Sequence, residues 1–167
     1  MAGIIIAILD RTGLGQALTL ILAAVGEDSL FLLLILTALV SILLGMGMPT
    51  SAIYLLLATM IAPSLIKLGV NPIAAHMFVL YFGLMSMITP PVAIAAFAAA
   101  SLSGAKPMET GMTAVRLGWI AYVIPFVFVL SPSLLGQGDL AHIALATVTA
   151  FAGVWIASCG LIGYLFG

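Results

Sequence analysis

The sequence predicts an all-α integral membrane protein that contains a re-entrant helical hairpin and a discontinuous membrane helix. Of its 167 residues, 65% are hydrophobic and 5% are charged, and the mean hydropathy is +1.40. An average soluble domain is about a quarter charged. Glycine, proline and threonine interrupt the apolar runs at two places, residues 45–50 and residues 89–91. We expect these two breaks to organise the rest of the chain.

Charge and cysteine content exclude two classes of function. The formal net charge is -1 and Lys and Arg total 4, so the chain cannot neutralise a nucleic-acid backbone and we expect no nucleic-acid partner. The single cysteine, Cys159, cannot form a disulfide or a thiolate metal cluster within one chain. We expect no cofactor.

Both ends of the chain lack the flanks that usually border a membrane span. The apolar stretch at residues 3–9 is too short for the roughly 30 Å hydrocarbon core, which needs about 20 helical residues. Residues 163–167 stop without a charged flank. We expect residues 1–28 to hold the end of a preceding helix and a short connecting helix over 18–25. The chain then reads as a fragment of a longer membrane protein.

A helical hairpin is predicted over residues 29–66. Ser29 can cap the first arm, which is apolar over residues 30–44 and about 22 Å long at 1.5 Å per residue. The second arm, residues 51–62, is shorter still. Because neither arm reaches across the bilayer, we expect a re-entrant hairpin with its tip at residues 45–50. One long kinked helix is the alternative, since proline is tolerated in membrane helices.

A discontinuous membrane helix is predicted over residues 71–103. Pro72 suits its first turn, and Thr89-Pro90-Pro91 interrupts it. Consecutive prolines remove two N–H donors and exclude the carbonyls four residues earlier. The helix should therefore open around three residues whose carbonyls become available as acceptors, Met85, Ser86 and Met87.

Residues 104–167 predict an interfacial segment followed by two membrane spans. The polar stretch 104–116 is typical of an amphipathic interfacial helix. Trp119 and Tyr122 lie where an interfacial aromatic belt is expected. The two spans are predicted over residues 120–135, with a kink at Pro125, and residues 140–166.

The two breaks predict a site for an ion or a solute. Irregular backbone at membrane depth persists only where it is buried in protein or lines a polar cavity. Unwound carbonyls and hydroxyls suit a small cation such as Na⁺, and the N-termini of the resumed half-helices suit a carboxylate. We assign the candidate substrate and cation site to Gly45, Gly47, Met48, Pro49, Thr50, Ser51, Ser86, Thr89, Pro90 and Pro91. A small cation such as Na⁺ would be held through Gly45, Thr50 and Thr89, and H⁺ is the alternative.

Other readings of the polar residues have less support. No serine lies in the setting of an intramembrane protease nucleophile, and the zinc-protease motif His-Glu-x-x-His is absent, so we expect no enzyme. His76 and His142 are candidates for a proton relay, with packed or interfacial histidines as the alternative. Met46 and Met48 could bind a soft metal, but thioethers more often serve packing.

Three motifs in order carry a resemblance to a known family. They are Gly45-Met46-Gly47-Met48-Pro49-Thr50-Ser51-Ala52, then Asn71-Pro72 with Ala74-Ala75-His76-Met77-Phe78, then Ile88-Thr89-Pro90-Pro91-Val92-Ala93. Over roughly residues 1–135 the chain resembles the large membrane subunit (DctM-like) of tripartite ATP-independent periplasmic (TRAP) transporters. The similarity is to the fused permeases that work with TAXI-type binding proteins.

The resemblance implies a function and a set of partners. It implies an elevator-type secondary transporter, multi-pass in the bacterial inner membrane, that imports organic acids such as dicarboxylates and is driven by Na⁺. The partners would be a periplasmic TAXI-type binding protein, a small membrane subunit or domain, and the rest of the permease. Residues 45–51 would form the tip of the second hairpin and Thr89, Pro90 and Pro91 the break of the following helix.

The chain departs from that family in length. Such permeases resemble two inverted repeats, each with one hairpin and one broken helix, and this chain carries one such half. We therefore expect the C-terminal portion of a permease whose other half is missing or separate. The alternative is a non-transporting membrane scaffold or a truncated gene fragment, in which both breaks are only kinks.

Overall fold

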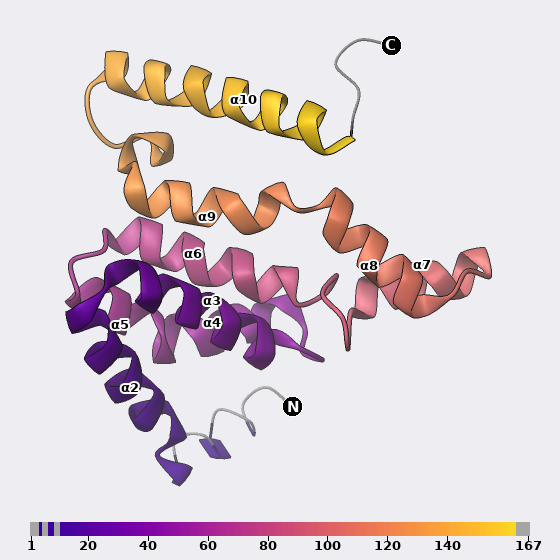
Figure 1. The fold of residues 1–167 in the computed structure, drawn as a ribbon. Coiled ribbons are helices and arrows are strands. Elements are labelled where there is room, and N and C mark those ends of the chain that lie inside the picture. The colour runs from indigo at the N-terminus through magenta and orange to yellow at the C-terminus, as the bar shows by residue number, and fades with distance from the viewer. Residues whose placement is uncertain (1–3, 5–6, 9–10, 163–167) are drawn as a thin grey trace. The chain divides into compact units, whose positions relative to one another are not determined.

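The computed structural model describes residues 4, 7–8 and 11–162, and across these residues it contains helices and no strand (Figure 1). Three helical runs are long and apolar enough to cross a membrane: Thr50–Lys67, Pro107–Leu130 and Leu140–Gly160. The predicted all-α membrane fold is confirmed. The chain divides into two compact units, residues 1–129 and residues 130–167.

The first unit opens with α2 (Leu14–Asp28), which is longer than the helix predicted over residues 18–25. The glycines near its two ends, Gly15 and Gly26, lie inside the helix and close to other side chains. A side chain at Gly15 would collide with Met60, and one at Gly26 would collide with Leu68. Most of the apolar stretch predicted at residues 3–9 lies outside the described residues.

The hairpin consists of α3 (Leu30–Gly45), a turn at residues 46–49, and α4 (Thr50–Met60). Ser29 caps α3 as predicted, accepting a hydrogen bond from the Leu32 N–H at 3.4 Å. The expectation of a short second arm is wrong. After Ile61 the chain continues as α5 (Ala62–Lys67), and Thr50–Lys67 is 18 residues long. Pro63 does not end this arm because it lies in the first turn of α5, where no helical hydrogen bond is lost.

Helix α6 (Pro72–Met85) packs against both arms of the hairpin. Its N-terminus is capped by the Asn71 side chain, which accepts from the N–H groups of Ile73 at 2.9 Å and Ala74 at 3.4 Å. The shared core is made of side chains at most 1% exposed, including Leu33, Leu34, Ile53, Leu56, Leu57, Phe78 and Val79. The hairpin and α6 therefore form one packed body.

The chain leaves helical geometry at residues 86–93, as predicted, and resumes as α7 (Ile94–Ser103). Gly104, in the left-handed region with φ of 71°, turns it into α8 (Pro107–Leu117), which lies beside α7 (Figure 1). Helix α9 (Ile120–Leu130) then returns along α6. The Phe126 ring meets Phe78 and Phe82 edge-on, with centroid distances of 5.3 and 5.6 Å.

The second unit holds a 3₁₀ turn, η1 (Pro132–Leu135), and the long α10 (Leu140–Ile162). The first predicted span over residues 120–135 ends earlier, at Leu130, because Pro132 begins the separate turn. The last predicted span starts at Leu140 as expected. Its end, residues 163–167, lies outside the described residues.

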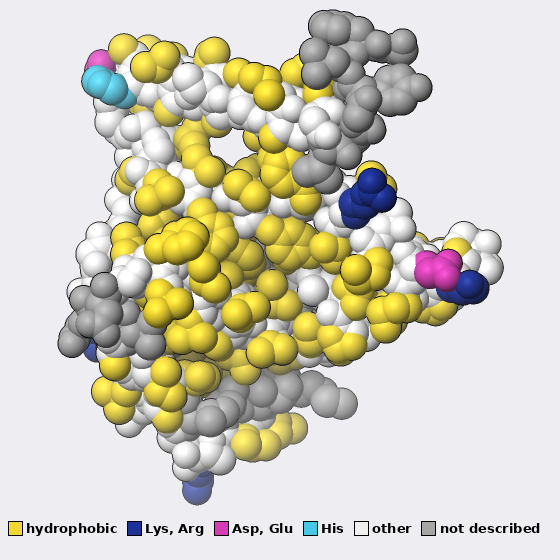
Figure 2. Space-filling model, viewed as in Figure 1, with side chains coloured by type: hydrophobic (Ala, Val, Ile, Leu, Met, Phe, Trp, Pro, Cys, Tyr) yellow, Lys and Arg dark blue, Asp and Glu magenta, His cyan; other side chains and the backbone are white. Residues whose placement is uncertain are grey.

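Hydrophobic side chains cover most of the face of the molecule shown in Figure 2. Exposed apolar residues include Leu39 and Leu43 on α3, Leu55 on α4 and Ile73 on α6, all more than half exposed. Such an outer surface is unusual for a water-soluble monomer and suits a hydrocarbon environment.

Candidate functional site

The two breaks meet at Gly45 and Ser86. A Cβ atom built on Gly45 would lie 2.8 Å from Ser86 Oγ and 2.9 Å from the Gly83 carbonyl oxygen. Gly45 is the last residue of α3 and Ser86 follows the last residue of α6. The C-terminal ends of both helices therefore converge, and any side chain larger than hydrogen at Gly45 would separate them.

The second arm reaches the same place through Gly83. A Cβ atom on Gly83 would lie 2.5 Å from Ile53 Cγ2 and 2.8 Å from Leu57 Cδ1, so α4 also touches the backbone of α6. The carbonyl ends of α3 and α6 carry partial negative charge, whereas the start of α4 carries partial positive charge. This junction thus offers a region suited to a cation beside one suited to an anion.

The tip of the hairpin leaves its amide groups open. Gly47 turns the chain with a positive φ of 81°. Among the described residues, no backbone hydrogen bond starts from the N–H groups of Thr50 or Ser51, and Pro49 gives no side-chain cap. Both hydroxyl side chains are exposed. Met48, in contrast, is buried, with 9% of its surface exposed.

Hydrogen bonds within the second break correct the expectation that Met85 and Met87 offer free carbonyls. The Met85 carbonyl accepts from the Ile88 N–H at 3.1 Å, the Thr89 N–H at 3.0 Å and the Thr89 hydroxyl at 2.5 Å. The Met87 carbonyl accepts from the Ala95 N–H at 3.0 Å. The opened backbone folds back on itself, so these two oxygens are occupied.

Other carbonyls of the break remain available. In the part of the chain that the structure describes, no backbone donor reaches the carbonyl oxygens of Ser86, Ile88, Pro90, Pro91 or Val92. Of the three predicted acceptors, the Ser86 carbonyl is thus the one that stays open among the described residues. Ser86 is 2% exposed, and its hydroxyl donates to the Gly83 carbonyl at 2.6 Å.

Helices α8 and α9 hold the second break from the other side. A Cβ atom at Gly111 would lie 3.0 Å from Pro90 Cγ, and one at Gly118 would lie 3.2 Å from Ile88 Cδ1. The Tyr122 hydroxyl lies 2.7 Å from Thr89 Oγ1. Sequence reasoning placed Tyr122 in an interfacial belt and missed this contact, since nothing in the local sequence pairs it with a threonine 33 positions away.

The structure joins some of the predicted site residues and leaves others apart. Gly45 and Ser86 touch, and Thr89 bonds within its own break and to α9. Between the residues that the structure describes, no hydrogen bond links Thr50 or Ser51 to Thr89. The Thr50 and Thr89 pair of the proposed cation site stays a prediction.

The contacts of the two histidines involve no residue of either break. His76 Nδ1 is 3.2 Å from the Tyr54 hydroxyl, on the outside of α4 and α6. His142 Nδ1 is 3.9 Å from the carboxylate of Asp139, with both side chains largely exposed. Neither contact connects a histidine to the tip or to the break of the helix.

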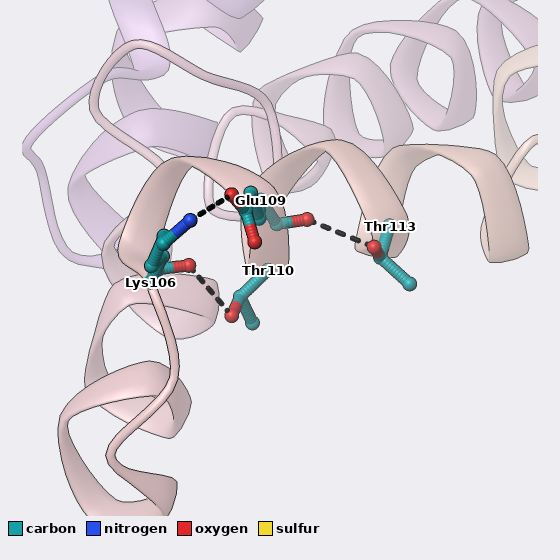
Figure 3. A network of polar contacts seen from close by, with 4 residues as sticks. All are labelled: Lys106, Glu109, Thr110 and Thr113. Atoms are coloured by element: carbon teal, nitrogen blue, oxygen red, sulfur yellow. Dashed lines mark hydrogen bonds and ion pairs between the residues drawn. The ribbon is translucent and has the colours of Figure 1, made fainter.

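A surface hollow of about 460 Å³ lies at α8, lined by residues that include Lys106, Glu109 and Thr113. Lys106 and Glu109 form an exposed ion pair at 2.8 Å, and Thr110 and Thr113 donate to backbone carbonyls one turn earlier. Figure 3 shows that these contacts stay within one face of the helix. These polar groups already have partners within the chain. The junction at Gly45 and Ser86 is therefore the better candidate for a binding site.

The chain matches a protein-family model. The model of the DctM component of tripartite ATP-independent periplasmic transporters matches residues 1–143, a span that includes the hairpin tip and the second break. No curated protein and no solved structure matched at the threshold that we applied. Such components are membrane parts of transporters and not enzymes. The chain, with its hairpin and broken helix meeting at Gly45 and Ser86, belongs to the DctM family of TRAP transporter components.

Proposed function

We propose that the chain is part of a secondary active transporter that imports organic acids such as dicarboxylates across the bacterial inner membrane, coupled to a Na⁺ gradient. TRAP systems combine the DctM component with a periplasmic binding protein and a small membrane subunit. In our proposal the binding protein is of the TAXI type, and the remaining permease half completes the transport path.

The convergence of α3 and α6 at Gly45 and Ser86 is the observation that carries the proposal. Two helix C-termini meet there, and among the described residues no backbone donor reaches several carbonyls of the second break, whereas the Gly45 carbonyl accepts from the Met48 N–H at 3.4 Å. Na⁺ is coordinated by backbone oxygens of this kind in transporters. Among the described residues, no cluster of three or more His, Cys, Asp and Glu side chains exists. A cation at this place would therefore be held by carbonyls and hydroxyls.

The start of α4 supports the organic-acid part of the proposal. Within the described part of the chain, the N–H groups of Thr50 and Ser51 donate no backbone hydrogen bond, and both hydroxyl side chains are exposed. This arrangement resembles the helix N-termini that bind carboxylates. A carboxylate there would lie beside a cation at the ends of α3 and α6, so each ion would favour binding of the other. That mutual attraction would couple substrate uptake to the Na⁺ gradient.

Uptake into proteoliposomes tests this proposal. The complete permease is reconstituted with its binding protein outside, and a panel of labelled organic acids is offered with and without an inward Na⁺ gradient. We expect gradient-dependent uptake of at least one acid. Thr89→Val and Thr50→Val should abolish it, whereas Thr59→Val should not, because Thr59 bonds only within its own helix, far along α4 from the tip.

Two results would count against the proposal. Wild-type uptake in both Thr50→Val and Thr89→Val would remove the site assignment and leave the breaks as kinks. Absence of uptake of every acid, with or without Na⁺ or H⁺ gradients, would favour the alternative of a non-transporting membrane scaffold.

A further inference from the structure

The hydrogen bonds at Thr89 fix which group supplies each proton. A threonine hydroxyl has one proton and two lone pairs. Thr89 Oγ1 lies 2.5 Å from the Met85 carbonyl and 2.7 Å from the Tyr122 hydroxyl. A carbonyl oxygen can only accept, so the Thr89 proton is used on Met85. Tyr122 must therefore donate to Thr89.

We propose that Tyr122 is a positioning residue for the ion site, which holds the Thr89 hydroxyl so that its one remaining lone pair is available to a cation. This inference rests on the proposed function. One lone pair of Thr89 Oγ1 accepts from Tyr122, and its proton is held by Met85. The direction of the other lone pair is then set by two partners on two different helices.

The surroundings of Tyr122 keep its hydroxyl in place. Its ring packs against Phe82 of α6, with centroids 6.5 Å apart, and Phe126 one turn later packs on the same Phe82 at 5.6 Å. Gly118, one turn earlier, lies against Ile88 of the break. Contacts on both sides of Tyr122 thus fix the position of α9. They hold the Tyr122 hydroxyl within hydrogen-bond distance of Thr89 Oγ1.

Removing the phenol oxygen separates positioning from packing. Tyr122→Phe keeps the ring contact with Phe82 and loses only the donated hydrogen bond. Tyr81→Phe is the matched control, because the Tyr81 ring packs edge-on against Phe128 at 5.7 Å and lies on the same pair of helices. Within the described residues, the Tyr81 hydroxyl makes no hydrogen bond.

The experiment is a Na⁺ titration of uptake in the complete, reconstituted permease with its binding protein. For Tyr122→Phe we expect the half-saturating Na⁺ concentration to rise by about three- to tenfold, the effect of losing one net hydrogen bond, with maximal uptake little changed. Tyr81→Phe should titrate as the wild type does. A second measurement does not require transport. A fixed Na⁺ concentration should raise the thermal midpoint in detergent, and this rise should be smaller than in the wild type for Tyr122→Phe but not for Tyr81→Phe.

Each outcome separates this inference from the proposed function. If Thr89→Val abolishes uptake while Tyr122→Phe has the wild-type Na⁺ titration, the role of Tyr122 is overturned and the site stands. If Tyr122→Phe lowers maximal uptake at an unchanged half-saturating concentration, Tyr122 is structural and the inference is again overturned. If Thr89→Val transports as the wild type does, the proposed site itself fails, and the role of Tyr122 fails with it.

Discussion

Gly45 and Ser86 touch so closely that a single methyl group on Gly45 would lie 2.8 Å from Ser86 Oγ. This contact joins the tip of the hairpin to the break of the following helix, two segments about forty residues apart in the chain. The junction therefore requires a residue without a side chain at position 45, whether or not a ligand is bound.

Gly45→Ala should therefore open the junction and abolish uptake. Overpacking of this kind costs about 1–3 kcal/mol, and the clash with the Gly83 carbonyl at 2.9 Å involves backbone that cannot rotate away. Uptake and the thermal midpoint in detergent measure the two effects. Gly153→Ala is the control, since no atom of the described residues lies within 4 Å of its added Cβ. Wild-type uptake by Gly45→Ala would contradict the close contact.

A double-mutant cycle tests the packing of α4 on α6. Gly83→Ala places a methyl 2.5 Å from Ile53 Cγ2, and Ile53→Ala removes that carbon. The double variant should be less destabilised than the sum of the single variants, by about 0.5–3 kcal/mol, as read from thermal or denaturant unfolding in detergent. Leu55, which is 54% exposed on the same helix, is the control: Leu55→Ala should combine additively with Gly83→Ala. Additivity in both pairs would show that α4 does not touch Gly83.

The buried hydroxyl of Thr37 should cost stability. Thr37 is fully buried in α3, and its Oγ1 has no hydrogen-bond partner among the described residues. An unsatisfied buried hydroxyl costs about 1–3 kcal/mol, so Thr37→Val should raise the thermal midpoint. Thr19→Val should lower it, because Thr19 donates to Gly15 at 2.9 Å and lies 3.1 Å from the Met60 carbonyl. A decrease in both variants would mean that Thr37 has a partner.

The two helix caps should contribute differently to the free energy of unfolding. Asn71 accepts from two N–H groups, at 2.9 and 3.4 Å, whereas Ser29 accepts from one at 3.4 Å. We expect Asn71→Ala to cost about 1 kcal/mol and Ser29→Ala less. Unfolding of both variants in detergent measures the difference. Equal losses, or a larger loss for Ser29→Ala, would contradict this ranking.

The sequence predicted those features that depend on chemistry within one turn of the chain. Glycine and proline at residues 45–50 and 89–91 set the positions where helices stop, and the structure is non-helical at residues 46–49 and 86–93. The Ser29 cap was also predicted, because its hydrogen-bond donor lies only three residues further along the chain. The length of the second arm was not, because a proline in the first turn of a helix does not end a run.

The site could be predicted only in part. Sequence reasoning located both breaks, but it could not show that the Met85 and Met87 carbonyls are consumed by hydrogen bonds from residues further along. It also could not pair Tyr122 with Thr89. Both depend on how the chain returns after the break, which local patterns do not encode.

By itself, the sequence determined that this is a helical membrane protein with two interrupted helices, because apolar composition and the conformational limits of glycine and proline act locally. The tertiary structure decided what those interruptions meet. It brings the ends of α3 and α6 together at Gly45 and Ser86 and places Tyr122 beside Thr89. Such contacts depend on the close packing of helices that are distant in sequence, where a missing Cβ atom or one hydroxyl decides which groups can touch.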